Sequence, residues 1–129
     1  MKAVYQDPDA PECGAACIAM LADVSLKEAR LAVYGEGKPK RLGRKKVLAV
    51  LKAEFNILAT TLKCRRISKR VKLTDLKSNA LLHGATLYKD GKKWKKSLHW
   101  LVWDFECQCV RDPLGFVKPI QVTSATELS

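Results

Sequence analysis

The sequence has no long apolar run. None of its hydrophobic stretches reaches the roughly 18 consecutive residues that a membrane-spanning helix requires, so we expect no transmembrane segment. The first residues, Met1 to Pro8, also lack the apolar core that a secretory signal peptide contains. With neither element in view, the sequence predicts a cytoplasmic protein.

Acidic residues are scarce. The chain has 13 Asp and Glu against 24 Lys and Arg, a formal net charge of +11, and most of the basic residues fall in 36–72 and 89–96. Such a surface attracts an acidic protein partner or nucleic acid, although Trp94 among the lysines is the only stacking candidate and no nucleic-acid motif is recognised. A solvated, solubilising face explains the charge equally well. The candidate partner-binding residues are Arg41, Arg44, Lys45, Lys46, Lys92, Lys93, Lys95 and Lys96.

The five cysteines are an odd number, and their spacing matches no disulfide framework. The pair Cys-x-x-Cys, typical of structural zinc sites, is missing. We therefore expect free thiols in a reducing compartment, with no metal and no other cofactor. The weaker alternative is a metal site in which Cys107 and Cys109 supply two thiolates and Cys64 or His83 joins them.

A chain of 129 residues that is 47% hydrophobic suits one domain, spanning 1–129. Apolar residues at helical spacing predict helices over about 13–22, 26–34 and 44–55, the second capped by Ser25 and Glu28 and ended by Gly35. The second half favours strands over 57–63, 80–88, 98–104, 107–111 and 116–122, with a short helical turn at 75–78 capped by Thr74. The pattern predicts an α+β fold in which N-terminal helices pack on a C-terminal antiparallel sheet.

Three residues suggest a catalytic site. Cys13 precedes Gly14 at the start of the first predicted helix, where the helix dipole favours thiolate over thiol. His99 opens a late strand, and Asp112 follows it before a proline. Cysteine, histidine and aspartate in this order are typical of a papain-like triad of nucleophile, general base and orienting carboxylate.

Each of these residues also has a structural explanation. The weaker explanation of Cys13 is a small buried side chain at a helix start, and Cys17 on the same helix face is expected in the core. Asp104 competes for the orienting role but lies on the strand face opposite His99. His83 competes with His99, and its apolar surroundings predict a core-strand histidine near a substrate groove.

The segment from Glu12 to Cys17, Glu-Cys-Gly-Ala-Ala-Cys, followed by Ile-Ala-Met-Leu, resembles the nucleophile helix of the bacteriocin-processing double-glycine peptidases, a papain-like family. His99-Trp-Leu-Val-Trp is similar to the family's His-aromatic-Val-Val strand, and Asp112-Pro is similar to its Asp-Pro. The resemblance covers about 6–115. It implies a papain-like cysteine peptidase fold with Cys13, His99 and Asp112 as the triad.

The resemblance also implies that Gln6 and the backbone N–H of Cys13 form the oxyanion hole. Gln6 stands seven residues before Cys13, one residue further away than in the family, so the loop between them must bulge. If Gln6 is misplaced, the loss of one oxyanion donor costs about 3–4 kcal/mol in the barrier, and activity is weak rather than absent.

We therefore expect a cysteine peptidase, or a related thiol acyl transferase, that acts on a peptide or protein substrate. The resemblance implies cleavage after small residues such as Gly-Gly. One alternative is a non-catalytic papain-like module that binds an acidic protein or nucleic acid through its basic surface. Another is a small toxin or effector that uses the same triad as a protease or deamidase.

Overall fold

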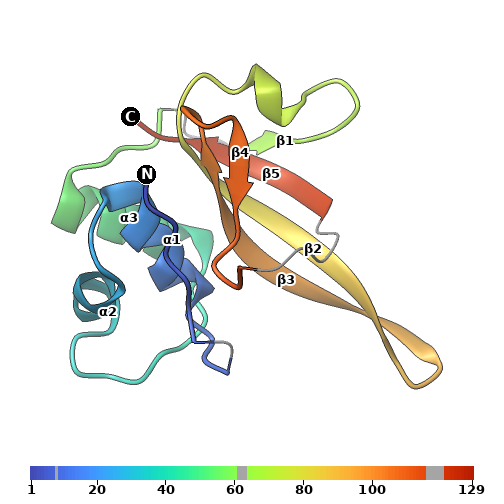
Figure 1. Ribbon diagram of the computed structural model, residues 1–129, viewed down its shortest axis with the longest axis horizontal. Helices are drawn as coiled ribbons and strands as arrows, with labels where there is room; N and C mark the ends of the chain where they lie inside the picture. Colours follow the sequence, from blue (N-terminus) through green and yellow to red (C-terminus); the bar gives the residue numbers. More distant parts are fainter. Residues whose placement is uncertain (8, 61–63, 116–120) are drawn as a thin grey trace.

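Helices form the first half of the chain and strands the second. The computed structural model describes residues 1–7, 9–60, 64–115 and 121–129, without the side chains of 86–89 and 96. The elements are α1 (Cys13–Ala22), α2 (Leu26–Tyr34), α3 (Arg44–Phe55), β1 (Arg65–Arg66), a 3-10 turn η1 (Leu73–Asp75), β2 (Ala80–Asp90), β3 (Lys93–Asp104), β4 (Cys109–Arg111) and β5 (Gln121–Glu127) (Figure 1). The predicted α+β class is confirmed. No helix within the described ranges is both long and apolar enough to cross a bilayer.

The helix boundaries follow the predicted signals. The Ser25 side chain accepts the Glu28 N–H at 3.1 Å, and Gly35 ends α2 with a positive φ of 59°. Gly35 tolerates that angle because it has no Cβ. The short turn lies at Leu73–Asp75 rather than at 75–78, because the Asp75 carboxylate accepts the Lys72 N–H at 2.9 Å and so closes an earlier turn.

The five strands form one antiparallel sheet in the order β1-β5-β2-β3-β4. The strand predicted over 57–63 is wrong in its described part: Ala59 makes only an isolated bridge to Leu128, and 61–63 lie outside the described residues. Ile57 packs instead against the helix-side core. Of the strand predicted over 116–122, residues 116–120 also lie outside the described residues, and β5 begins at Gln121.

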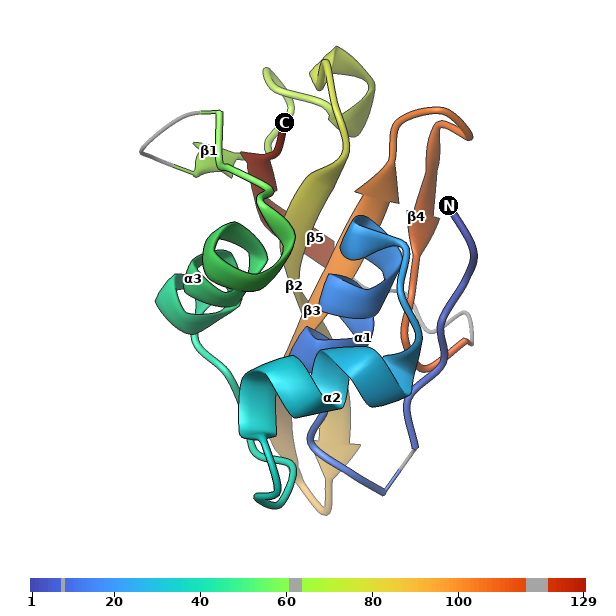
Figure 2. The same cartoon turned by 90° about the vertical axis from the view of Figure 1, so that its left-hand side faces the viewer.

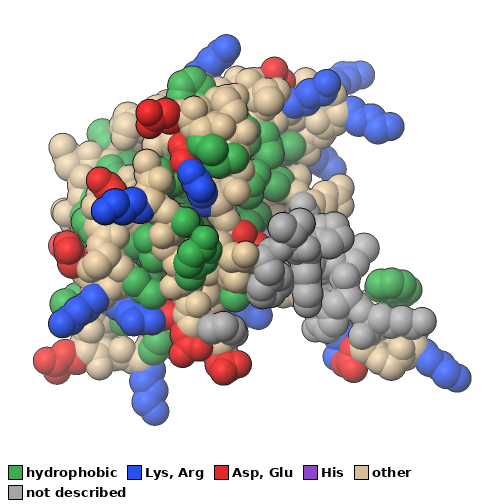
Figure 3. Space-filling model, viewed as in Figure 1, with side chains coloured by type: hydrophobic (Ala, Val, Ile, Leu, Met, Phe, Trp, Pro, Cys, Tyr) green, Lys and Arg blue, Asp and Glu red, His purple; other side chains and the backbone are tan. Residues whose placement is uncertain are grey.

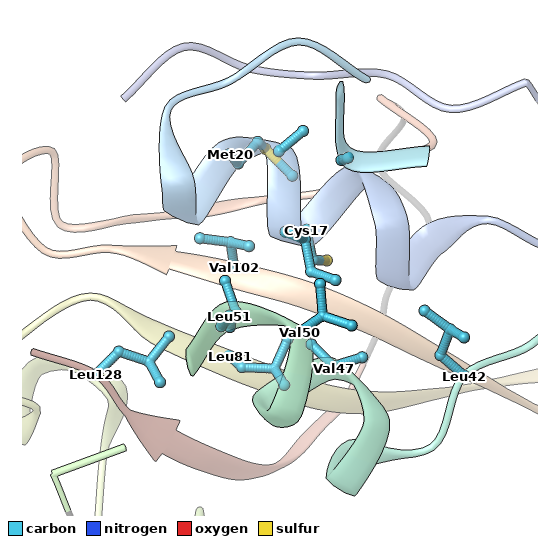
Figure 4. Close-up of a cluster of buried hydrophobic side chains, with 12 residues drawn as sticks. Cys17, Met20, Leu42, Val47, Val50, Leu51, Leu81, Val102 and Leu128 are labelled. Carbon is cyan, nitrogen blue, oxygen red and sulfur yellow. The ribbon is translucent and has the colours of Figure 1, made fainter. Parts of the chain in front are cut away.

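Apolar side chains fill both faces of the sheet. The three helices cover one face (Figure 2), and the larger cluster lies between them and the sheet (Figure 4). It includes Cys17 and Met20 of α1, Val47, Val50 and Leu51 of α3, and Leu81 and Val102 of the sheet. A second cluster joins Leu76, Leu82, Leu101, Trp103 and Ala125. Fully burying each large aliphatic side chain stabilises the fold by about 1.5–3 kcal/mol. Cys17 is fully buried in the larger cluster, so it lies in the core, as predicted.

The hairpin of β2 and β3 extends beyond the rest of the sheet. Its register is continuous to the pair Asp90 and Lys93, and the last pair of β2 and β5 among the described residues is Ala85 and Gln121. The outer part of the hairpin projects from the body of the molecule, at the lower right of Figures 1 and 3. Trp94 near its tip is 68% exposed.

Candidate active site

The first turn of α1, the middle of β3 and the turn after β4 meet at one cavity of about 520 Å³. Gln6, Cys13, Arg41, His83 and His99 all contribute to its lining. Cys13 is the first residue of α1 and is half-buried. Backbone N–H groups in the first turn of a helix have no intrahelical acceptor, so they are available to a negative charge at this position.

His99 and Asp112 are joined directly. The His99 Nε2 lies 2.8 Å from Asp112 Oδ1, and both side chains are largely buried. The same Oδ1 accepts the Leu114 N–H at 2.8 Å, and the Gly115 N–H donates to the Asp112 carbonyl at 2.9 Å. These bonds make a turn in which Gly115 has a φ of 73°, a conformation suited to glycine. The turn fixes the carboxylate that orients the imidazole.

A hydrogen bond also joins Cys13 and His99, whose Nε2 lies against Asp112. Burial raises the pKa of the Cys13 thiol, but hydrogen bonds from His99 and from the Trp100 N–H lower it further than burial raises it, so the net shift is downward. Burial lowers the pKa of His99, but hydrogen bonds with Asp112 and Cys13 outweigh it and raise that pKa to about 9. The opposite shifts favour a thiolate–imidazolium pair.

Gln6 reaches the same cavity despite its spacing. The extra residue is absorbed by a turn in which the Ala10 N–H donates to the Asp7 carbonyl at 3.1 Å and the Asp9 N–H donates to Asp7 Oδ1 at 3.0 Å. Gln6 Nε2 donates to the Ala10 carbonyl at 2.8 Å and to the Asp7 carbonyl at 3.4 Å, so it is engaged within this loop. Among the described residues, its buried Oε1 has no hydrogen-bond partner. The oxyanion role of Gln6 therefore stays a prediction.

Glu12, directly before the candidate nucleophile, was not identified from the sequence as a site residue. Its side chain is fully buried and accepts two hydrogen bonds from Arg30 of α2, at 2.8 and 2.6 Å, and one from the Asp7 N–H at 3.0 Å. The Arg30 hydrogen bond lowers the pKa of the Glu12 carboxyl more than burial raises it. Through these bonds Glu12, the residue directly before Cys13, is connected to Asp7 in the Gln6 loop and to Arg30 of α2. Its position in the Glu-Cys-Gly motif was the available signal, but no local pattern points to Arg30.

The two rival residues lie in different surroundings. The His83 ring contacts the Trp100 ring, with centroids 4.7 Å apart and planes tilted by 48°, and His83 lines the cavity, as its expected position near a groove suggested. Asp104 binds Arg111 at 3.1 and 3.2 Å through Oδ2 and accepts the Cys107 N–H at 3.3 Å. Asp112, and not Asp104, is therefore the carboxylate that contacts His99.

Leu42 contacts both α1 and β3, the elements that carry Cys13 and His99. A Cβ added to Gly14 would lie 3.0 Å from Leu42 Cδ1, so the absence of a side chain at Gly14 lets Leu42 pack against the start of α1. The Trp100 Nε1–H donates to the Leu42 carbonyl at 2.8 Å. The residue after Cys13 and the residue after His99 therefore hold the same leucine. Neither contact is visible in the sequence, because the residues are far apart in it.

The predicted partner-binding residues do not form one surface of free cations. Arg44 bonds Thr126 at 3.1 Å, and Lys95 forms an ion pair with Asp90 at 2.7 Å. The Lys96 side chain lies outside the described ones. Lys45, Lys46, Lys92 and Lys93 are exposed, and Arg41 is both exposed and part of the cavity lining.

Cys107 and Cys109 form a disulfide, so the prediction of free thiols is wrong for these two. The turn after β3, in which Gln108 has a φ of 56°, brings their Cα atoms to 5.3 Å. The two sulfurs and Asp104 have ligand atoms within 4.8 Å of one another. Within the described residues, neither Cys64 nor His83 belongs to that cluster, so the metal site proposed from the sequence is not assembled.

No protein-family model, no curated protein and no solved structure matches the chain. The assignment of a function therefore depends on the geometry and chemistry of the cavity.

Proposed function

We propose that this protein is a papain-like cysteine peptidase that hydrolyses a peptide or protein substrate with Cys13, His99 and Asp112. The supporting observation is the connected arrangement of the three residues. The thiol pKa of Cys13 is lowered, the pKa of His99 is raised to about 9, and Asp112 lies 2.8 Å from His99 at the wall of an accessible cavity.

In the proposed reaction, the Cys13 thiolate attacks the carbonyl carbon of the substrate, and the carbonyl electron pair moves to oxygen. The Cys13 N–H and the Gln6 amide stabilise this oxyanion. His99 gives its proton to the leaving amine as the C–N bond breaks, which leaves a thioester on Cys13. Water then attacks the thioester carbonyl carbon and gives a proton to His99, the C–S bond breaks, and the acid product leaves with the Cys13 thiolate and the His99 imidazolium restored. Asp112 orients the imidazole throughout.

The first test measures the alkylation of each cysteine by iodoacetamide from pH 4 to 9, followed by peptide mass spectrometry. We expect Cys13 to react fastest, with an apparent pKa below the ordinary thiol value, and we expect that pKa to rise in His99→Ala. Cys64 is the matched reference because it is an exposed free thiol. If Cys13 reacts no faster than Cys64 at any pH, the Cys–His pair is not functional and the proposal fails.

The second test incubates wild type and Cys13→Ala with a mixture of peptides that includes Gly-Gly and Gly-Ala sequences. Peptide cleavage that needs Cys13 supports a peptidase. Loss of a side-chain amide from an intact peptide, again dependent on Cys13, supports the related deamidase. If wild type and Cys13→Ala give the same products in the same amounts, catalysis by Cys13 is contradicted. The non-catalytic binding module would then be the better explanation.

A further inference from the structure

Arg41 contributes a positive charge to the wall of the catalytic cavity. It lines the same space as Cys13 and His99, and its side chain is exposed. Among the described residues it forms no ion pair, including with Asp9, the exposed acid of the same cavity. The guanidinium is therefore available to a ligand that enters the cavity.

The backbone next to Arg41 is fixed. Leu42 is 8% exposed, packs against Gly14 and accepts the Trp100 Nε1–H at 2.8 Å. Position 41 is therefore held relative to both Cys13 and His99 by their immediate neighbours. Because the backbone at position 41 is held by its neighbour Leu42, an arginine that lines the cavity there loses less freedom on binding a ligand than one on an unanchored loop.

We propose that Arg41 binds a carboxylate of the substrate, so that the cavity selects acidic polypeptide segments. This inference depends on the proposed function. A guanidinium donates two parallel hydrogen bonds to a carboxylate, a geometry that a lysine does not reproduce. The net charge of +11 also increases the encounter rate with acidic chains. The carboxylate belongs either to an Asp or Glu side chain near the scissile bond or to a free C-terminus.

The first experiment needs no known substrate. Cys13 is alkylated with iodoacetate, which carries a carboxylate, and with iodoacetamide, which is neutral, and the ratio of the two rates is measured. We expect Arg41→Gln to lower this ratio about fivefold and Arg41→Lys to lower it less, because the charge remains. The control is Lys27→Gln, which removes an equal charge from the exposed side of α2, outside the cavity lining. It should leave the ratio unchanged.

The second experiment uses peptides that wild type cleaves, in pairs that differ only by Glu and Gln at one position. We expect kcat/KM to be about fivefold higher for the Glu peptide with wild type and equal for the two peptides with Arg41→Gln. Each peptide is also made with a free and with an amidated C-terminus. A preference that disappears on amidation identifies the terminal carboxylate as the group that Arg41 binds.

The outcomes separate the two proposals. If Cys13 reacts rapidly but the iodoacetate to iodoacetamide ratio is the same in wild type and Arg41→Gln, the role of Arg41 is wrong and the peptidase proposal stands. Equal kcat/KM values for every Glu and Gln pair with wild type would overturn it in the same way. If Cys13 has an ordinary thiol reactivity, the proposed function fails first, and the alkylation ratio alone then decides whether Arg41 binds carboxylates.

Discussion

Glu12 and Arg30 form an ion pair with two hydrogen bonds, of which the carboxylate half is fully buried and the guanidinium half is 41% exposed. A buried carboxylate is stable only when its oxygens are satisfied, and the Asp7 N–H supplies the third bond. The pair joins α2 to the residue before Cys13, so it supports both the fold and the position of the candidate nucleophile.

We expect Glu12→Gln to lower the free energy of unfolding by about 2 kcal/mol, because it removes charge-assisted hydrogen bonds from a buried site. Denaturant unfolding measures the change. The control is Lys95→Gln, which breaks the exposed Lys95–Asp90 pair and should cost less than about 1 kcal/mol. Equal losses would mean that burial adds nothing to the Glu12 pair.

The contribution of Glu12 should also depend on pH. The hydrogen bond from Arg30 holds the folded-state pKa of Glu12 below the ordinary carboxyl value of 4.5. A group with a depressed pKa stabilises the fold above its unfolded pKa and loses that contribution as the pH falls through the folded pKa. The difference in unfolding free energy between wild type and Glu12→Gln should therefore be constant near neutral pH and shrink below about 4.5. A difference that grew on acidification would contradict the direction of the shift.

Asp112→Asn should separate the orienting role from folding. Without the carboxylate, the pKa of His99 should fall from about 9 towards the ordinary value of 6.5, and the pKa of Cys13 should rise. NMR titration of His99 and the alkylation profile of Cys13 measure the two changes, and we expect peptide cleavage to fall about a hundredfold or more. Asp104→Asn is the control, because Asp104 binds Arg111 and should leave both pKa values unchanged.

The pH dependence of cleavage should have two limits. Activity should rise as Cys13 loses its proton, at a pH below the ordinary thiol pKa, and fall near pH 9, where His99 loses the proton that the leaving group needs. The two values belong to the coupled pair rather than to single residues. A cleavage rate that kept rising above about pH 9 would contradict the thiolate–imidazolium pair.

The interactions that raise the pKa of His99 also stabilise the fold. This contribution is fully present below about pH 6.5 and disappears as the pH rises through about 9.

Thiol counting tests the disulfide. In denaturant without reductant, three thiols should react, from Cys13, Cys17 and Cys64, and all five should react after reduction. Five reactive thiols before reduction would show that Cys107 and Cys109 are unpaired in the purified protein. Cys107→Ser with Cys109→Ser serves as the matched variant, in which reductant should not change the number.

Local signals accounted for most of the fold. Ser25, Glu28 and Gly35 marked the ends of α2 because capping depends on neighbours in sequence. The strand predicted over 98–104 lies within β3, but β3 begins earlier, at Lys93. The strand predicted over 57–63 failed because β propensity does not specify a partner. Ile57 follows the end of α3, with its N–H donating to the Leu51 carbonyl at 3.0 Å, and packs with the helices.

The sequence singled out the candidate residues that the structure brings together, because Cys13 stands before Gly14 at a helix start and Asp112 stands before Pro113. Their supports were not predictable. The contact between Glu12 and Arg30 and the bond from Trp100 to Leu42 join side chains across tertiary packing, so no short pattern records them. The disulfide was missed because its two cysteines meet only when Gln108 adopts a left-handed conformation.

The position of β5 has a consequence for the order in which the sheet is assembled. β5 follows all the other strands along the chain, yet it lies between β1 and β2 within the sheet. Cys13, His99 and Asp112 all precede it, so a ribosome synthesises the complete set of reactive groups before the strand that completes the sheet. Pairing a late strand between two earlier ones requires contacts between distant parts of the chain and is correspondingly slow. Until it inserts, β2 lacks one of its two neighbours in the sheet, and the sheet behind the candidate site is incomplete.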